Sequence, residues 1–203
     1  MHAALTTALA LVFAAPVHAA PTPYSPEGVE SNVQYEFIAA STGDVLAYFA
    51  GSNAGNTNEI ALLVNGVDTG IQGLNNHSAT YGQMLSFGAV TAGDRLVFKL
   101  VNTNTPSVGP FFSDRSLNAD GFNHIYAANY IGDEFIPAGI AVGFEDLPNG
   151  GDFDYNDENF VFVNVANAVD VSEVPEPASV ALLLAGVAGI SASRRRVKRA
   201  HRA

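Results

Sequence analysis

The chain has 203 residues, with twenty acidic and nine basic side chains and a formal net charge of −11 at pH 7. Such a negative surface repels phosphate backbones and anionic lipid headgroups, which argues against nucleic-acid binding and membrane-surface binding. Cysteine is absent, which excludes disulfide bonds, thiol catalysis and cysteine-ligated zinc.

The N-terminal residues 1–19 are typical of a secretion signal. An apolar run extends from Leu5 to Ala15, and a Val-His-Ala motif ending at Ala19 supplies the small residues that signal peptidase requires. Cleavage is expected between Ala19 and Ala20. A cut after Ala20 is less favourable, because it would leave Pro21 directly after the cut, where proline is poor. An ordinary buried helix is the alternative. We therefore predict a signal peptide and export by the secretion machinery.

Residues 20–173 are long enough for one domain with its own core. They hold three basic and nineteen acidic residues, a formal charge of −16, so the domain should attract cations. Helical periodicity is nearly absent, and short runs of Val, Ile, Phe and Tyr alternate with Gly, Asn, Asp and Thr turns. Strands are expected near residues 33–39, 44–50, 59–65, 84–87, 95–102, 124–130, 139–145 and 158–165. This pattern predicts an all-β fold, an antiparallel β-sandwich of the jelly-roll kind.

Three local patterns add detail to this fold. Asn65-Gly66 follows an apolar run and predicts a hairpin, because that turn needs positive φ at both central residues. Apolar and polar side chains alternate over residues 95–100, so the even-numbered ones should face the core and the odd-numbered ones, Val97 included, should face solvent. Residues 102–119 are expected to form a loop whose aromatic pair at Phe111 tucks under the sheet edge.

The segment 145–158 holds six carboxylates and no Lys or Arg. Two like charges about 4 Å apart repel by about 1 kcal/mol in bulk water, and by several times that where water is partly excluded. The segment therefore needs a counter-ion. Acidic and amide side chains alternate from Asp152 to Asn156 as in calcium loops, and Gly150-Gly151 allows the tight bend that brings them together.

All available donors are oxygens, so a hard cation is expected, Ca²⁺ in preference to Mg²⁺. The spacing is not that of an EF-hand, because Asp157 stands where that loop has glycine and Val163 where it has a bidentate carboxylate. A solvated acidic turn that bonds its own backbone is the alternative. The predicted metal ligands are Glu145, Asp146, Asp152, Asp154, Asn156 and Asp157, with backbone carbonyls completing the set.

The same segment carries a family resemblance. It reads Phe-Glu-Asp-Leu-Pro at 144–148, Gly-Gly-Asp at 150–152 and Asp-Tyr-Asn-Asp at 154–157, followed by a Phe/Val strand. These motifs resemble domain of unknown function 4114, and Asp-Gly-Phe-Asn-His at 120–124 is similar to that family's preceding strand entry. The resemblance implies a calcium-binding domain of secreted bacterial surface proteins, without implying a reaction.

Catalytic patterns are weak, and we expect no enzyme activity. The domain has two histidines, His77 in a Gly/Asn loop and His124 at a strand start, and no Gly-x-Ser-x-Gly elbow. A structural role is favoured for His124, since no nucleophile accompanies it. A glycosidase needs two carboxylates across a cleft, whereas this chain crowds several into one turn.

Residues 174–203 consist of a short motif, an apolar stretch and a basic end. Pro175-Glu176-Pro177 precedes an apolar stretch at 178–192, and six of the nine basic residues follow it. A transmembrane helix over this stretch would span about 23 Å, short of the ~30 Å hydrocarbon core. Its basic end would stop transfer and stay on the cytoplasmic side. A helix this short suits a segment that is removed after recognition.

This order resembles the PEP-CTERM sorting signal of Gram-negative bacteria. The resemblance implies processing by an exosortase, an integral-membrane cysteine protease, and an association with exopolysaccharide and biofilm. A plain C-terminal membrane anchor is the alternative interpretation.

These patterns together predict a non-catalytic, calcium-stabilised protein that is held in the inner membrane by its tail until processing. It would then reach the cell surface or the extracellular matrix. A calcium-dependent carbohydrate-binding module is the second hypothesis. The chain has no Trp, so a tyrosine such as Tyr81 or Tyr155 would have to form the sugar platform. A secreted hydrolase is the third.

Overall fold

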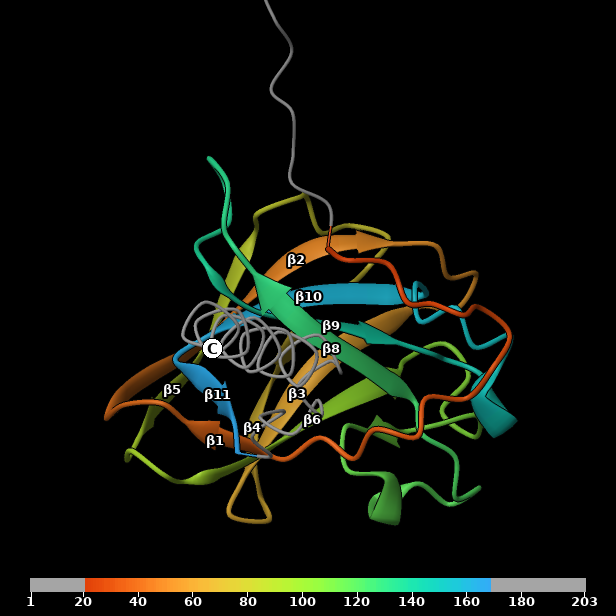
Figure 1. Cartoon of the computed structure of the whole chain (residues 1–203), viewed down its shortest axis with the longest axis horizontal. Helices are drawn as coiled ribbons and strands as arrows, with labels where there is room; N and C mark the ends of the chain where they lie inside the picture. Colours follow the sequence, from red (N-terminus) through yellow and green to blue (C-terminus); the bar gives the residue numbers. More distant parts are fainter. Residues whose placement is uncertain (1–20, 169–203) are drawn as a thin grey trace, which may run out of the picture. The chain divides into compact units, whose positions relative to one another are not determined.

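The computed structural model describes residues 21–168, whose regular structure consists of β-strands and two short 3₁₀ helices (Figure 1). The predicted signal peptide and sorting tail lie outside these residues. Within this part of the chain, no helix is both long and apolar enough to cross a membrane. The elements are β1 (Phe37–Ala39), β2 (Gly43–Ser52), β3 (Asn58–Val64), β4 (Val67–Gly73), β5 (Met84–Val90), β6 (Arg95–Asn102), β7 (Phe111–Phe112), η1 (Arg115–Leu117), β8 (Ile125–Tyr130), β9 (Gly139–Phe144), η2 (Pro148–Gly150), β10 (Glu158–Val163) and β11 (Val165–Asn167).

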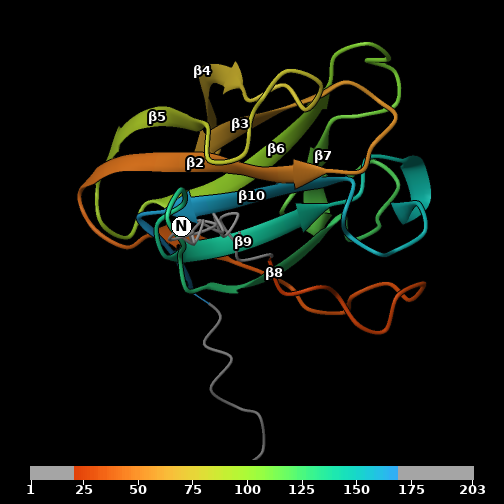
Figure 2. The ribbon, with the colours of Figure 1, turned by 90° about the horizontal axis from the view of Figure 1, so that it is seen from above.

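The strands form two antiparallel sheets. The first sheet has the order β11-β1-β6-β3-β4, with β7 paired to β6, and the second has the order β5-β2-β10-β9-β8. Figure 2 shows β10 running between β2 and β9, with β8 beyond β9. The acidic segment 145–158 therefore joins two neighbouring inner strands of the second sheet.

An aromatic core lies between the sheets. Phe98 of β6 stacks on Phe162 of β10 with ring centroids 3.6 Å apart, and Phe37 of β1 lies 5.0 Å from Phe98. All three side chains are fully buried. Burying a phenylalanine side chain contributes about 1.5–3 kcal/mol, so these contacts between the two sheets are a main source of stability.

The all-β fold of antiparallel strands is confirmed, and so is the predicted hairpin. Asn65 and Gly66 have φ of 51° and 82° and join β3 to β4. The strand β4 itself is not among the strands that the sequence predicts. This strand alternates between exposed and half-exposed residues at the edge of its sheet, so it has no apolar face to mark it.

Two other local predictions need correction. The region 102–119 contains β7 and η1 rather than loop alone, and the ring of Phe111 is buried there. Val97, predicted to face solvent, is only 2% exposed. Its neighbours on the same strand face, Arg95 and Lys99, make ion pairs on either side of it. Long charged side chains can cover apolar surface with their aliphatic stems, a general effect that is consistent with the burial of Val97.

Candidate functional site

The backbone of the acidic segment curls back towards β9. Five of its residues have positive φ: Asn149, Gly150, Gly151, Phe153 and Tyr155. Positive φ is uncommon in residues other than glycine and costs about 1–3 kcal/mol each there, so it persists only where the surroundings impose it. The curl brings the backbone N–H of Tyr155 within 2.6 Å of Glu145 Oε1, to which it donates.

This curl gathers three carboxylates. Glu145, Asp152 and Asp154 each place an oxygen so that the three atoms lie within 4.8 Å of one another. We call these residues the Glu145 cluster. Glu145 is fully buried, and its Oε2 has no hydrogen-bond partner within the described chain. Burial raises the pKa of Glu145 to about 8, with the neighbouring carboxylates adding to the effect and the Tyr155 N–H opposing it.

Glycine at position 151 is required for this arrangement. Gly151 has φ of 54°, and a Cβ there would overlap Glu145 Oε2. Gly143 of β9 is constrained in a similar way, since its Cβ would overlap the carbonyl oxygen of Tyr155. The curled backbone thus packs directly against Glu145 and β9, without intervening side chains.

The remaining acidic residues of the segment have different partners. Asn58 of β3 donates from Nδ2 to Asp146 Oδ2 at 2.6 Å and to Glu158 Oε1 at 3.3 Å. Ser52 of β2 also donates to Glu158 Oε1, at 3.3 Å. Asp157 Oδ2 accepts a hydrogen bond from the backbone N–H of Asp146 at 3.0 Å. We call Asn58, Asp146, Asp157 and Glu158 the Glu158 cluster.

The Glu158 cluster is also short of positive charge. Burial raises the pKa of Glu158 to about 9; hydrogen bonds from Asn58 and Ser52 oppose this, and the charges of Asp146 and Asp157 add to it. Burial also raises the pKa of Asp157, and the nearby charge of Asp146 adds to that shift.

The basic side chains of residues 21–168 pair elsewhere. Each of the three Lys and Arg residues has a carboxylate partner outside both clusters, so neither cluster is neutralised by this part of the chain. The ion pairs are Arg95–Asp114, Lys99–Asp68 at 2.6 Å and Arg115–Glu30 at 3.1 Å.

The sequence grouped six ligands into one metal site, and the structure gathers three of them in the Glu145 cluster. The side chain of Asp146 instead reaches Asn58. Asn156 holds Asp154 in place, with its backbone N–H donating to Asp154 Oδ1 at 3.1 Å and its side-chain amide donating to Oδ2. The sequence reasoning did not identify Asn58, because it lies on a distant strand and no local motif marks it.

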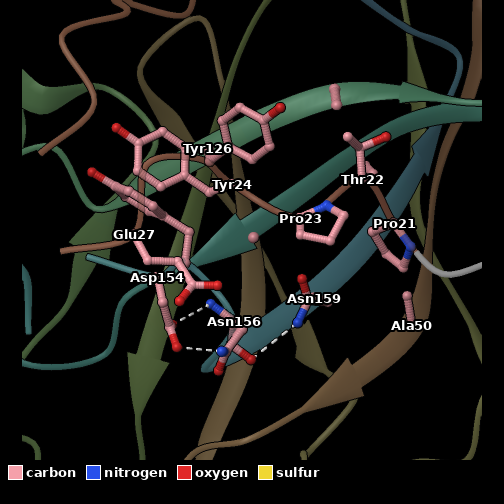
Figure 3. A pocket seen from close by; sticks show the side chains of 14 residues that line it. Pro21, Thr22, Pro23, Tyr24, Glu27, Ala50, Tyr126, Asp154, Asn156 and Asn159 are labelled. Atoms are coloured by element: carbon pink, nitrogen blue, oxygen red, sulfur yellow. Dashed lines mark hydrogen bonds between the residues drawn. The ribbon is translucent and has the colours of Figure 1, made fainter. Parts of the chain in front are cut away.

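A pocket of about 270 Å³ lies beside the Glu145 cluster (Figure 3). Its lining includes Tyr24, Tyr126 and Tyr155 together with the acidic side chains Glu27 and Asp154. Asp154 therefore belongs both to the Glu145 cluster and to the pocket wall. An ion bound at the cluster would lie next to whatever occupies the pocket.

The predicted role of Tyr155 as an exposed sugar platform is wrong. Tyr155 is only 3% exposed. Its hydroxyl accepts from the Ser31 N–H at 2.9 Å and donates to the Asn123 carbonyl at 3.3 Å. Tyr81 is half-buried, and its hydroxyl donates to Asp133 at 2.6 Å.

His124 holds the backbone at the base of the acidic segment. Its ring is fully buried, stacks on Phe111 with centroids 4.0 Å apart, and lies 3.1 Å from the carbonyl oxygen of Glu145 through Nδ1. Nε2 lies 2.9 Å from Asp120 Oδ2. Both ring nitrogens are thus engaged, and the contacts position Glu145.

Comparison with known proteins gives two matches. Residues 173–196 match the PEP-CTERM protein-sorting motif, which indicates an exported protein sorted by an exosortase. No curated protein and no solved structure matches the chain. Residues 53–165, which include the whole acidic segment, match the Domain of unknown function (DUF4114). Because this second match covers more than half of the 203 residues, the chain belongs to the DUF4114 family.

Proposed function

We propose that this chain is a non-catalytic exported protein whose β domain is stabilised by Ca²⁺ bound at the Glu145 cluster. One observation carries the proposal: within residues 21–168 the buried Oε2 of Glu145 has no hydrogen-bond partner, and a Glu145 carboxylate oxygen lies close to oxygens of Asp152 and Asp154. A desolvated carboxylate needs a compensating charge, and like charges beside it increase that need. The donors are all oxygens, which suits a hard cation.

Calcium fits this site better than magnesium. Ca²⁺ takes six to eight oxygens in flexible geometry, whereas Mg²⁺ demands a near-ideal octahedron. Backbone carbonyls of the curled segment would complete the shell beside the three carboxylates. The ion would hold a strained segment between β9 and β10, and so stabilise the middle of the second sheet.

The proposal extends to the protein's place in the cell. The sorting motif supports export, and we propose that the tail 174–203 is removed before deposition at the surface or in an exopolysaccharide matrix. Two antiparallel sheets around a shared aromatic core support a β-sandwich of jelly-roll kind. Such a domain suits a structural component of a matrix.

Thermal unfolding of the full-length protein tests calcium binding. A ligand that binds only the folded state stabilises by RT ln(1 + [L]/Kd), about 1.4 kcal/mol at a tenfold excess over Kd. We expect Ca²⁺ to raise the melting temperature by several degrees relative to EGTA, as read by circular dichroism. Mg²⁺ should do less.

Two variants make the test specific to the site. Asp154→Asn should markedly reduce the gain, because it removes a ligand of the Glu145 cluster. Asp44→Asn changes an exposed aspartate on β2 and should leave the gain intact. Equal melting temperatures in EGTA and in millimolar Ca²⁺ would contradict the proposal.

A carbohydrate-binding function is the second candidate, favoured by the pocket beside the cluster. Half-buried Tyr24 and Tyr126 line it, and Asp154 links it to the proposed ion. A sugar hydroxyl could then bind the ion while a ring packs on tyrosine. Calcium-dependent binding on a glycan array, lost in Tyr126→Ala, would support this function. Binding that is equal in EGTA would count against it.

A further inference from the structure

The Glu158 cluster joins the two ends of the acidic segment to a strand that is far from them in the sequence. Asn58 begins β3 of the first sheet, Asp146 follows β9, and Glu158 begins β10. The side chains are almost completely buried, with Asn58 1%, Asp146 2% and Glu158 0% exposed. The two sheets therefore share a polar contact at this end of the domain, where a hydrophobic contact would be usual.

Two buried oxygens of this cluster have no hydrogen-bond partner in residues 21–168. They are Oε2 of Glu158 and Oδ1 of Asn58. The Asn58 amide group contacts Asp146 and Glu158 through its nitrogen, so the unpartnered Oε2 of Glu158 belongs to a side chain that is already part of this group. Native proteins rarely leave such groups unsatisfied, since each costs about 1–3 kcal/mol.

The donors present cannot neutralise the charge. The carboxyl groups of Asp146, Asp157 and Glu158 are near enough to interact electrostatically, and their side-chain partners in the described chain are the neutral groups of Asn58 and Ser52. A buried carboxylate is stable only when it is paired or bound to a metal. The set consists of carboxylate and amide oxygens, the ligands that calcium accepts.

We infer that the Glu158 cluster is a second divalent-cation site, distinct from the Glu145 cluster, which binds Ca²⁺ between the two sheets. Asp146, Asp157 and Glu158 supply carboxylate oxygens, and Asn58, which donates to Asp146 and Glu158 through Nδ2 in the structure, supplies its amide oxygen after rotation of the amide group. Asp157 interacts electrostatically with Glu145 as well as with Glu158, so its charge acts on both sites. This ion would fasten β3 of one sheet to β9 and β10 of the other.

Calcium stoichiometry of the full-length protein tests this inference. After equilibrium dialysis against Ca²⁺, elemental analysis should find two ions per chain. Glu158→Gln and Asp154→Asn should each bind one ion, and the double variant none. The control Asp44→Asn should bind two. Asp157→Asn should weaken both binding steps in a calorimetric titration, because the charge of this carboxylate acts on both sites.

The Glu158→Gln variant also distinguishes between two roles of Glu158, a ligand of an ion and a neutral buried acid. Glutamine has the shape of glutamic acid without its charge, so Glu158→Gln should fold at least as well as the parent in EGTA. It should lose part of the calcium-induced rise in melting temperature. Asp146→Asn provides an independent second variant with the same expectation.

Each outcome discriminates between the two sites. One ion in the parent and in Glu158→Gln alike would overturn the second site and leave the Glu145 cluster standing. Loss of an ion in Glu158→Gln but not in Asp154→Asn would support the second site and contradict the first. No bound ion in the parent would overturn both.

Discussion

Two groups of carboxylates in this domain have pKa values that are shifted in opposite directions. On the first sheet, the hydrogen bond from Lys99 lowers the pKa of Asp68. Burial would raise the pKa of Asp114, but hydrogen bonds from Ser116 and Arg95 outweigh it and lower that pKa. In the acidic segment, burial raises the pKa of Glu145 to about 8 and that of Glu158 to about 9.

The difference shows how charge is distributed over the fold. The three Lys and Arg residues of positions 21–168 pair with aspartates and a glutamate away from the acidic segment, so this part of the chain gives the buried carboxylates there no counter-charge. The same chemical group is thus an ion-pair partner on the first sheet and a buried group without a cationic partner in the acidic segment. The net charge of the chain does not show where in the fold the counter-charge is missing.

The largest expected effect comes from the core, whose contribution to stability should not depend on ion binding. Phe98→Ala should lower the free energy of unfolding by about 3–5 kcal/mol, because it leaves a cavity against Phe162. The loss should be the same in EGTA and in Ca²⁺, as measured by urea unfolding. A loss that depends strongly on calcium would mean that core and acidic segment do not act independently.

The second-largest expected effect is the pH dependence of the free energy of unfolding. The folded-state pKa values of Glu145 and Glu158 lie above their unfolded values, so the stability they contribute is present below about pH 4.5 and is lost as pH rises through 8–9. In EGTA, the free energy of unfolding should fall by roughly 1–3 kcal/mol between pH 5 and pH 9. Ca²⁺ should flatten this dependence, because it takes the place of the protons.

Asp68 and Asp114 serve as the internal contrast to this prediction. Their pKa values are lowered, so their contribution is present above about pH 4 and is lost only as pH falls further. Melting curves in EGTA across the range should therefore report mainly the acidic segment, and Glu145→Gln should reduce the slope. Stability that rises from pH 5 to pH 9 in EGTA would contradict the comparison.

The smallest expected effect concerns an ion pair of the first sheet. Lys99→Met removes the partner of Asp68, whose side chain is 42% exposed. Exposed pairs contribute about 0.2–1 kcal/mol and are screened by salt. Chemical unfolding should show a loss of that size, which shrinks at high ionic strength, with calcium binding unchanged. A calcium effect in this variant would show that the two groups of carboxylates are coupled.

Sequence alone determined the features that depend on near neighbours. The Asn65-Gly66 turn, the buried even-numbered residues of β6 and the acidic segment with its Gly150-Gly151 bend all follow from patterns within a few residues. Local patterns are reliable because backbone sterics and side-chain alternation act over that range. The family motifs of the acidic segment are local in the same sense, and the DUF4114 match bears them out.

Only the tertiary structure decided which side chains meet. Asn58 contacts Asp146 and Glu158 across 88 and 100 residues of sequence, and no local pattern predicts that contact. Tyr155 is buried and has positive φ, and its sequence neighbours signal neither property. The physical reason is the same in both cases: strand order and backbone curl bring distant groups together, and burial then sets the charge that they can carry.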